Sequence, residues 1–352
     1  MKELLRLLVG LVVLSLVPGC AGDISTPSAD GWPTSRPEAQ GMDGKLLEQA
    51  IITIDQEELA VHSMLVIRNG VIVTERYHPL YGRSKKHDLH SITKSVVSAM
   101  VGIAIDKGFI SSVEDPVLSY FPDYVPDGDP RRQAITLEHL LTMSSGLRQI
   151  DTLQMLQSDD AAQHVLDLEM TSEPGTTWDY NDGNYHLLSA ILQRTTGMRA
   201  LEFAEAYLFG PLDISDITWG SDQNGITMGG WGLWMTPRDA AKIGQLYLND
   251  GVWEGEQVVP AEWVHRTVKE RWQIENPGEP WNVYYGYGWW LHEIGAFAAH
   301  GSGGQFIYVM PDLDVVVVFT GGLSDPELVE PELLIRKCVM PALGPSASEV
   351  GN

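Results

Sequence analysis

The chain contains very little cysteine. Its 352 residues include two, Cys20 and Cys338. A fold held together by several disulfides is therefore excluded, and so is a zinc site built from cysteines. Stability must come from a buried apolar core, which a chain of this length can build.

Basic residues are scarce as well. The chain has 23 Lys and Arg against 47 Asp and Glu, which gives a formal net charge of -24. Binding to nucleic acid or to an anionic membrane surface requires a basic patch. We therefore expect no nucleic-acid partner and no polyanionic substrate. With 44% hydrophobic and 20% charged residues, the composition is that of a globular protein of one large or two moderate domains.

Several catalytic signatures are missing from the chain. There is no Gly-x-Ser-x-Gly, no His-Glu-x-x-His, no Cys-x-x-Cys and no Walker loop. The ten histidines are scattered without the spacing of metal ligands. We therefore expect no metal and no cofactor.

An apolar run near the N-terminus, 7–17, is too short to span a membrane. Basic residues precede it and small residues follow it, which is the pattern of a secretory signal peptide. The segment 1–20 ends in Val-Pro-Gly-Cys, which resembles the bacterial lipobox. We expect Cys20 to be lipidated, so that the protein is exported and anchored to a bacterial membrane, in the periplasm or at the cell surface. The alternative is a plain signal peptide cleaved near Ala21 or Gly22.

Strand patterns occur near both ends of the chain. Two stretches rich in β-branched residues, 62–68 and 71–77, flank Asn69-Gly70, which predicts a β-hairpin. Further strands are predicted at 284–292, 297–300, 305–310 and 315–320. Helical spacing is found at 43–58, 91–107, 137–143, 161–168, 185–195, 200–208, 237–249, 260–270 and 326–340.

These elements predict an α/β protein of the α+β type. One antiparallel sheet would be flanked by N- and C-terminal helices and would carry a mainly helical inserted domain. We expect the sheet domain to comprise 41–108 and 281–345, the helical domain to comprise 109–280, and the active site to lie between them. Residues 21–40, rich in Pro, Ser, Gly and Asp, are expected to form a flexible tether.

The stretch HSITKSV, residues 90–96, places a lysine three residues after a serine. Residues three apart share a helix face, so the Lys94 amine can reach the Ser91 hydroxyl, which becomes a nucleophile when a base takes its proton. The apolar neighbours predict that burial lowers the pKa of Lys94 and lets the amine act as that base. The same spacing is also found in a helix with a surface serine and a lysine, and arises by chance about once in a chain this long.

Two further motifs follow, and together the three resemble the serine β-lactamase and penicillin-binding protein superfamily. The likeness is strongest to its branch of class C-like esterases, D-amino-acid peptidases and 6-aminohexanoate-dimer hydrolases. The connecting stretches 136–146 and 229–247 are similar to that branch, so the resemblance covers about 41–345. The motifs are Ser91-Ile-Thr-Lys94, Tyr180-Asn-Asp182 and His300-Gly-Ser-Gly-Gly304.

The resemblance implies a β-lactamase/DD-peptidase-like fold and a cofactor-free acyl-enzyme mechanism. Ser91 would be the nucleophile, Lys94 its proton acceptor, and Tyr180 would relay a proton to the leaving group. Taken from its neighbours alone, Tyr180 is more simply interpreted as an aromatic residue before a turn that caps the next helix. The N–H groups of Ser91 and Gly303 would form the oxyanion hole, with Ser302 as the alternative second donor.

The chain departs from the family pattern at two positions that bear on substrate. His300 stands where the family commonly has lysine, and Asp182 stands where it has asparagine. Because histidine is mostly neutral at pH 7, a permanent charge beside a β-lactam carboxylate is lost. We therefore expect ester or amide substrates without an essential anion, contacted by Asp182, His300, Gly301 and Ser302. The alternative for His300 is a structural histidine at a strand end.

Three functions are compatible with these patterns. The first is a serine hydrolase that cleaves a small ester, amide or peptide in a cleft lined by Trp178 and Trp231, although core packing is the alternative for both tryptophans. The second is a D-Ala-D-Ala carboxypeptidase or β-lactamase. The third, of a different class, is a surface lipoprotein that binds a ligand without catalysis.

Overall fold

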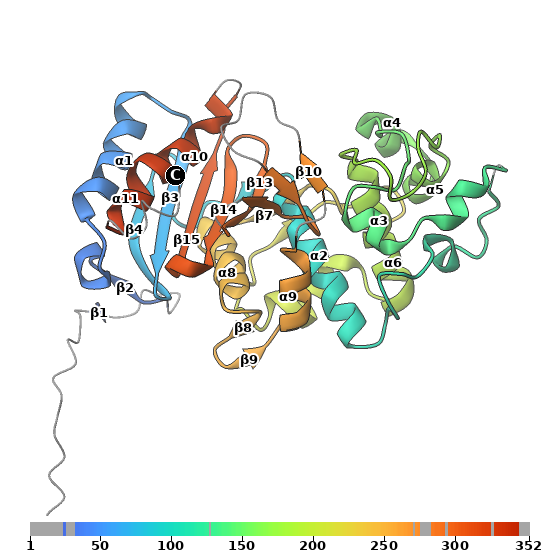
Figure 1. The fold of residues 1–352 in the computed structure, drawn as a ribbon, viewed down its shortest axis with the longest axis horizontal. Coiled ribbons are helices and arrows are strands. Elements are labelled where there is room, and N and C mark those ends of the chain that lie inside the picture. Colours follow the sequence, from blue (N-terminus) through green and yellow to red (C-terminus); the bar gives the residue numbers. More distant parts are fainter. Residues whose placement is uncertain are drawn as a thin grey trace, which may run out of the picture.

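The computed structural model describes residues 24–25, 32–126, 128–269, 272–274, 283–292, 295–324 and 327–344. These residues form a ten-stranded sheet that is antiparallel except where β2 runs parallel to β4 (Figure 1). In spatial order its strands are β1 (Ile24–Ser25), β2 (Thr34–Ser35), β4 (Val71–Tyr77), β3 (Val61–Arg68), β15 (Val315–Gly321), β14 (Gln305–Met310), β13 (Phe297–Gly301), β12 (Trp290–His292), β11 (Val283–Tyr285) and β10 (Trp272–Ile274).

The predicted hairpin joins β3 to β4. Asn69 has φ of 51° and Gly70 has φ of 73°, the left-handed pair that a two-residue hairpin turn requires. One strand prediction near the C-terminal end is wrong. The stretch 284–292 forms two strands, β11 and β12, because the Gly286 N–H donates to the Trp289 carbonyl at 3.0 Å and closes a turn between them.

Apolar residues cover both faces of the central strand β15. Successive strand residues point to opposite faces, so Val316 and Val318 join one apolar cluster while Val315 and Val317 join the other. On one face lie α1 (Gly44–Gln56) and the C-terminal segments, as predicted for 326–340. Those segments are η6 (Glu327–Val329), α10 (Glu330–Leu334), η7 (Ile335–Val339) and α11 (Met340–Ala342).

The other face of the sheet is covered by α8 (Pro237–Leu248) and α2 (Ile92–Asp106). Nearly every residue of α2 is buried, so this helix lies inside the molecule and connects the sheet to the helical part. Although α8 comes from the stretch 109–280, it packs against β14, β15 and β3. The structure thus places one helix of that stretch in the sheet layer.

The remaining elements gather beyond α2 or on the surface (Figure 1). α6 contacts α2, α3, α5 and α7, which makes it the centre of the helical part. Two small sheets, β5-β7-β6 and β8-β9, complete the described fold. The bounds are η1 (Pro37–Gln40), η2 (Val117–Tyr120), η3 (Pro130–Ala134), α3 (Leu137–Leu141), α4 (Thr152–Gln157), α5 (Ala161–Leu166), α6 (Asp182–Thr196), α7 (Ala200–Ala204), η4 (Glu205–Phe209), α9 (Ala261–Thr267), β5 (His87–Asp88), β6 (Thr218–Trp219), β7 (Leu233–Met235), β8 (Val252–Trp253) and β9 (Glu256–Gln257).

The predicted fold class, a mixed α and β protein with a large antiparallel sheet, is confirmed. The stretch expected to be a tether differs, because part of it packs into the fold: Trp32 is buried and its indole N–H donates to the Gly70 carbonyl at 2.9 Å. Cys20 and the signal-peptide prediction lie outside the described residues. Within the described ranges, no helix is both long enough and apolar enough to cross a membrane.

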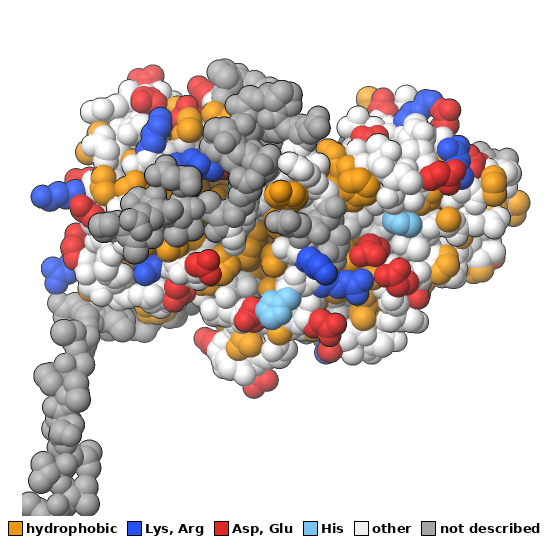
Figure 2. All heavy atoms as spheres, viewed as in Figure 1, with side chains coloured by type: hydrophobic (Ala, Val, Ile, Leu, Met, Phe, Trp, Pro, Cys, Tyr) orange, Lys and Arg blue, Asp and Glu red, His pale blue; other side chains and the backbone are white. Residues whose placement is uncertain are grey.

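The surface reflects the acidic composition. On the face shown in Figure 2, Lys and Arg side chains lie scattered among Asp and Glu side chains. Many of the described cations are paired with an acid; Arg238, for example, contacts Glu75 at 2.6 Å.

Candidate active site

Ser91 occupies the N-terminal end of α2. The residue before it, His90, has φ of 47°, in the left-handed region that a non-glycine residue rarely adopts. The Asp88 carboxylate accepts the His90 N–H at 2.9 Å and holds this turn. Such strained positions cluster at functional sites. Here the turn leaves the partly exposed Ser91 at the wall of a cleft.

Lys94 lies one helical turn after Ser91, as the spacing predicts. Its side chain is 1% exposed. The amine donates to Ser91 Oγ at 2.9 Å and to the Gly230 carbonyl at 2.7 Å. A third oxygen, Asp182 Oδ1, lies 2.6 Å from Nζ. Three oxygen neighbours match the three N–H groups of an ammonium ion.

The prediction that the pKa of Lys94 falls is wrong. Burial alone lowers the pKa of this amine, because a charged group loses hydration. Tyr180 and Asp182 act in the opposite direction through charge and hydrogen bonding, and the net effect raises the pKa of Lys94 above its ordinary value. These two neighbours favour the ammonium form of Lys94, and nothing in the sequence marks Asp182 as a neighbour of this amine.

Tyr180 lies in the loop before α6, with the centre of its ring 4.8 Å from the Lys94 amine. Its ring stacks on Trp290 with centroids 6.1 Å apart and packs against Trp178. The next residue, Asn181, caps α6 by accepting the Gly183 N–H at 2.9 Å. The capping turn and the position beside Lys94 therefore occur together, and the turn fixes where the phenol lies.

The end of β13 passes directly over the residues before Ser91. A side chain at Gly301 would place Cβ 2.2 Å from the Leu89 carbonyl oxygen, so only glycine allows this approach. Gly301 and Ser302 line the cleft. Gly303 sits in the β13–β14 turn, where its carbonyl accepts the Leu323 N–H at 3.0 Å, and it is not among the residues that line the cleft.

The cleft has a volume of about 370 Å³. Aromatic and aliphatic side chains form most of its wall, and among the described lining residues Glu332 is the one with a formal charge. No Lys or Arg is part of that described lining. The lining residues are Ser91, Tyr180, Ile274, Val283, Trp290, His292, His300, Gly301, Ser302, Phe306, Leu328, Val329 and Glu332.

Two histidines of the cleft wall are neutral. Burial, with a smaller contribution from His292, lowers the pKa of His300 to about 3. Burial, with a smaller contribution from Arg336, lowers the pKa of His292 to about 4. The His300 ring stacks on Trp290 at 5.7 Å and packs against Phe306 at 4.3 Å. His300 thus lies at a strand end and also faces the cleft, without supplying a positive charge at neutral pH.

The other predicted substrate contacts lie outside the cleft lining. Asp182 contacts Lys94 instead, Trp178 packs beneath Tyr180 and Tyr285, and Trp231 packs against the apolar core beside Gly230. Sequence reasoning missed His292 and Glu332, which come from β12 and α10. No motif marks either residue. The sheet order places β12, which carries His292, next to β13, whereas Glu332 comes from the C-terminal helix α10.

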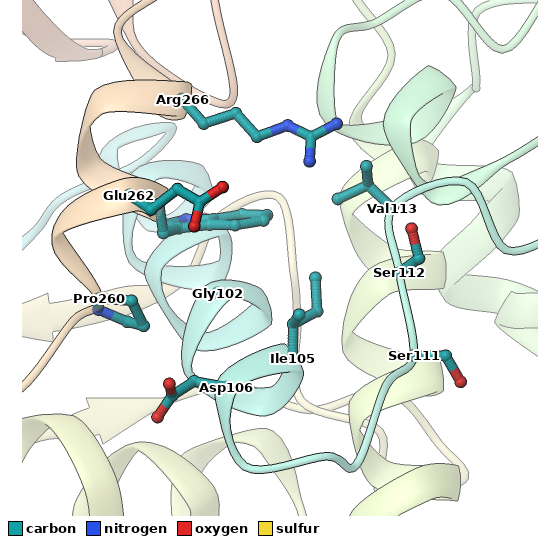
Figure 3. A pocket seen from close by; sticks show the side chains of 10 residues that line it. Gly102, Ile105, Asp106, Ser111, Ser112, Val113, Pro260, Glu262 and Arg266 are labelled. Carbon is teal, nitrogen blue, oxygen red and sulfur yellow. The ribbon is translucent and has the colours of Figure 1, made fainter.

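A second cavity, of about 330 Å³, opens at the other end of α2 (Figure 3). It lies between α9, the last turn of α2 and the loop 111–113, and Figure 3 shows Arg266 reaching across it toward Val113. With α2 rising about 1.5 Å per residue, this cavity lies roughly 20 Å from Ser91. It is therefore separate from the serine and lysine. In the part of the chain that the structure describes, no group of three His, Cys, Asp or Glu side chains is arranged to hold a metal ion.

Known proteins are similar to this chain in sequence or in fold. A curated relative, the 6-aminohexanoate-dimer hydrolase of Paenarthrobacter ureafaciens, is 26% identical over 89% of this chain and 84% of its own. A solved Bacillus anthracis structure, provisionally assigned as a 6-aminohexanoate-dimer hydrolase, has a TM-score of 0.70 at 21% identity and covers 86% of this chain and 83% of its own. A family VIII carboxylesterase has a TM-score of 0.68 at 15% identity over 90% of this chain and 98% of its own.

The model of the family described as Beta-lactamase matches residues 47–329. This range contains the Ser91 and Lys94 pair, Tyr180 and the glycine-rich end of β13. It also spans both the sheet and the helical part. The chain belongs to the Beta-lactamase family and is a serine hydrolase of that fold.

Proposed function

We propose that the protein hydrolyses small esters or amides through an acyl-enzyme on Ser91. The observation that carries this proposal is the 2.9 Å contact between Ser91 Oγ and the buried Lys94 amine at the wall of the cleft. The Lys94 amine and the Tyr180 phenol together form a proton-accepting pair beside the serine hydroxyl, as nucleophilic catalysis requires. The amidase and esterase among the similar proteins agree with this class of reaction.

In the proposed reaction, the pair formed by Lys94 and Tyr180 reacts in the form that has lost one proton. Ser91 Oγ attacks the substrate carbonyl carbon, and its proton passes to this pair. These two groups are coupled, so the proton belongs to the pair rather than to either residue. Tyr180 lines the cleft and delivers the proton to the departing alcohol or amine. Water then attacks the ester on Ser91, releases the acid and returns a proton to the serine.

Two backbone N–H groups stabilise the developing oxyanion in this proposal. One is that of Ser91, at the positive end of α2. For the second we propose Ser302 in place of Gly303, because Ser302 lines the cleft and Gly303 lies in the turn behind it. Donors aimed at a developing oxyanion contribute several kcal/mol to catalysis.

The wall of the cleft favours substrates without a carboxylate. The described lining lacks Lys and Arg, and His300 is neutral. A D-Ala-D-Ala carboxypeptidase or a β-lactamase must hold the carboxylate of its substrate, for which this lining offers no cation. Trp290, Phe306 and Val283 instead offer apolar contact to an acyl chain.

Covalent labelling tests the proposal. The protein is treated with a fluorophosphonate probe, and the modified peptide is identified by mass spectrometry. We expect one probe on Ser91 and none in the Ser91→Ala variant. Unlabelled wild type, or equal labelling of the variant, would contradict enzymatic use of this serine and would favour a binding module.

Substrate class is tested on the same preparation. We expect a short-chain p-nitrophenyl ester to be hydrolysed with a kcat/KM at least about 100-fold above that for a chromogenic cephalosporin, since a missing charged contact costs roughly this factor. Comparable values for the two substrates would support the cell-wall enzyme instead. Ser95→Ala is the matched control for Ser91→Ala in the labelling experiment. Ser95 is a buried serine of the same helix, and its hydroxyl donates to the Gly288 carbonyl at 2.6 Å.

A further inference from the structure

A third cavity, of about 540 Å³, lies beside α8 and shares no described lining residue with the cleft at Ser91. Its walls come from α8, from the β8–β9 hairpin beside that helix (Figure 1), and from segments near β2, η4 and the β3–β4 turn. The described lining residues are Trp32, Pro33, Gly70, Pro211, Leu212, Asp213, Lys242, Gln245, Asn249, Trp253 and Glu254. Because small-molecule sites usually have volumes of roughly 300 to 1,000 Å³, this cavity is large enough for a ligand of its own.

Two tryptophans form a corner of this cavity. The ring centroids of Trp32 and Trp253 are 5.9 Å apart, and the ring planes meet at 87°. Trp32 is buried and its indole N–H donates to the Gly70 carbonyl at 2.9 Å, which fixes the orientation of the ring. The face of an aromatic ring carries partial negative charge and attracts weakly positive C–H groups. The corner therefore suits a compact saturated ring that presents C–H groups.

A buried amide in the wall has unused hydrogen-bonding capacity. Gln245, on α8, is 4% exposed, and its Nε2 donates to Asn249 Oδ1 at 3.2 Å. Its Oε1 is buried and has no hydrogen-bond partner among the described residues. Buried polar atoms are nearly always paired in folded proteins, so this oxygen indicates the place of a ligand's donor group.

The charges around the cavity favour an uncharged ligand. Asp213 and Glu254 are exposed acidic residues of the lining, and they disfavour an anion. Lys242 is the one cation of the described lining, and its ammonium disfavours a cation. The Lys242 amine already donates to the Asp213 carbonyl at 2.8 Å and lies 3.7 Å from Asp239 Oδ1. A neutral ligand whose groups both donate and accept hydrogen bonds meets neither repulsion.

We propose that this cavity binds a saccharide. The C–H face of one sugar ring packs on Trp253, and a hydroxyl group of the ring donates to Gln245 Oε1. Other hydroxyl groups reach the polar side chains at the rim, since a hydroxyl both donates and accepts. The inference goes beyond hydrolysis at Ser91, because it adds a binding site whose described residues take no part in the proposed chemistry.

The test measures binding by tryptophan fluorescence and by ligand-observed saturation-transfer NMR. The probes are the methyl glycosides of glucose, galactose, mannose and N-acetylglucosamine. We expect saturable binding of at least one of them with a Kd of about 1 mM, the affinity typical of a ligand of this size. Cyclohexylmethanol, which has a six-membered carbon ring and a single hydroxyl, should bind at least about 10-fold more weakly because it forms fewer hydrogen bonds.

Two variants connect binding to this cavity. Trp253→Ala should raise Kd for the best glycoside at least about 10-fold, since it removes the aromatic face. Gln245→Met keeps a side chain of similar length but loses the amide oxygen, and it should raise Kd by about 2- to 10-fold, the range for one hydrogen bond. Trp234→Ala is the matched control, because Trp234 is a 42% exposed tryptophan of β7 outside the described lining. Its Kd should equal that of wild type.

The Ser91→Ala variant separates this cavity from the cleft. It should bind the same glycoside with the Kd of wild type, whether or not the protein hydrolyses esters. The inference is overturned if no glycoside binds saturably, or if cyclohexylmethanol binds as tightly as the best glycoside. It is also overturned if Trp253→Ala and Gln245→Met both leave Kd unchanged, or if Ser91→Ala abolishes binding.

Discussion

The two sides of the cleft differ in how completely their polar groups are satisfied. In the catalytic cluster of Ser91, Lys94, Tyr180 and Asp182, the Lys94 amine has three oxygen neighbours within 2.9 Å. On the other side, in the cleft wall formed by β12, the ring nitrogens of His292 have no hydrogen-bond partner among the described residues. The Lys94 amine thus has its oxygen neighbours before any ligand binds, whereas the His292 ring lacks hydrogen-bond partners.

From this difference we expect the catalytic cluster to determine the rate of reaction and the opposite wall of the cleft to determine which substrates are preferred. A cluster that is organised before the substrate arrives acts on any acyl group that reaches Ser91, since its electrostatics are already in place. A wall with unsatisfied polar atoms gains hydrogen bonds only with a ligand that carries the matching group. Changes in the catalytic cluster should therefore alter the rates for all substrates together, and changes at His292 in the cleft wall should alter the ranking of substrates.

The largest effect is expected from Tyr180→Phe. The phenol oxygen that exchanges the proton is lost while the ring remains stacked on Trp290. We expect kcat to fall by about 10²- to 10⁴-fold for a short-chain and a long-chain p-nitrophenyl ester alike, the usual contribution of general acid–base catalysis. Tyr284→Phe, on β11 and outside the cleft lining, is the control. Unequal losses for the two esters would contradict the separation of roles.

Asp182→Asn should shift the pH dependence of the catalytic cluster. The Asp182 carboxylate raises the pKa of Lys94, so its removal lets the proton-accepting pair lose its proton at lower pH. The acidic limb of kcat/KM against pH should move down by roughly 1 to 3 pH units, as for the loss of a close opposite charge. The variant is read out by pH profiles with one ester. An unmoved limb would mean that Asp182 does not control this proton.

Asp179→Asn is the matched control for that shift. Asp179 is an exposed residue three positions before Asp182; partial desolvation raises the pKa of its carboxyl, and Lys94 is not among the causes of that shift. Its replacement should leave the acidic limb within about 0.3 pH units of wild type, because a charge outside direct contact is screened. An equal shift in both variants would indicate a general charge effect and not the 2.6 Å contact.

The smallest effect is expected for the contribution of His292 to stability at acidic pH. Burial lowers the pKa of His292 to about 4, whereas an unfolded chain binds the proton near its ordinary value of 6.5. Between these values the unfolded state holds more protons, so the free energy of unfolding falls as pH falls. His292 should account for up to about 3 kcal/mol of this loss. His292→Phe should flatten the slope between pH 6.5 and 4 in urea denaturation; an unchanged slope would contradict a neutral His292.

Much of the fold was predictable from local patterns. Asn69-Gly70 marked the β3–β4 hairpin, and the four consecutive valines of β15 had to be buried on both faces. The spacing of Ser91 and Lys94 placed both on the first turn of α2. These features are local, because a turn or a helix face depends on residues close in the chain.

The rest depended on contacts between distant residues. Nothing near Lys94 in the chain shows that Asp182 lies 2.6 Å from its amine, so the direction of its pKa shift could not be predicted. Glu332 reaches the cleft from the C-terminal segment, more than 200 residues after Ser91. The turn between β11 and β12 depends on a backbone bond that a continuous apolar pattern conceals.

The central claim is that Ser91 carries the acyl group during turnover. It is tested most directly by acid quenching the protein within milliseconds of mixing with a p-nitrophenyl ester and measuring the mass of the Ser91 peptide. A mass increase equal to the acyl group, matched by a burst of nitrophenol and absent in Ser91→Ala, is the expected result. Turnover without any acylated Ser91 peptide, or with the same increase in Ser91→Ala, would contradict the account.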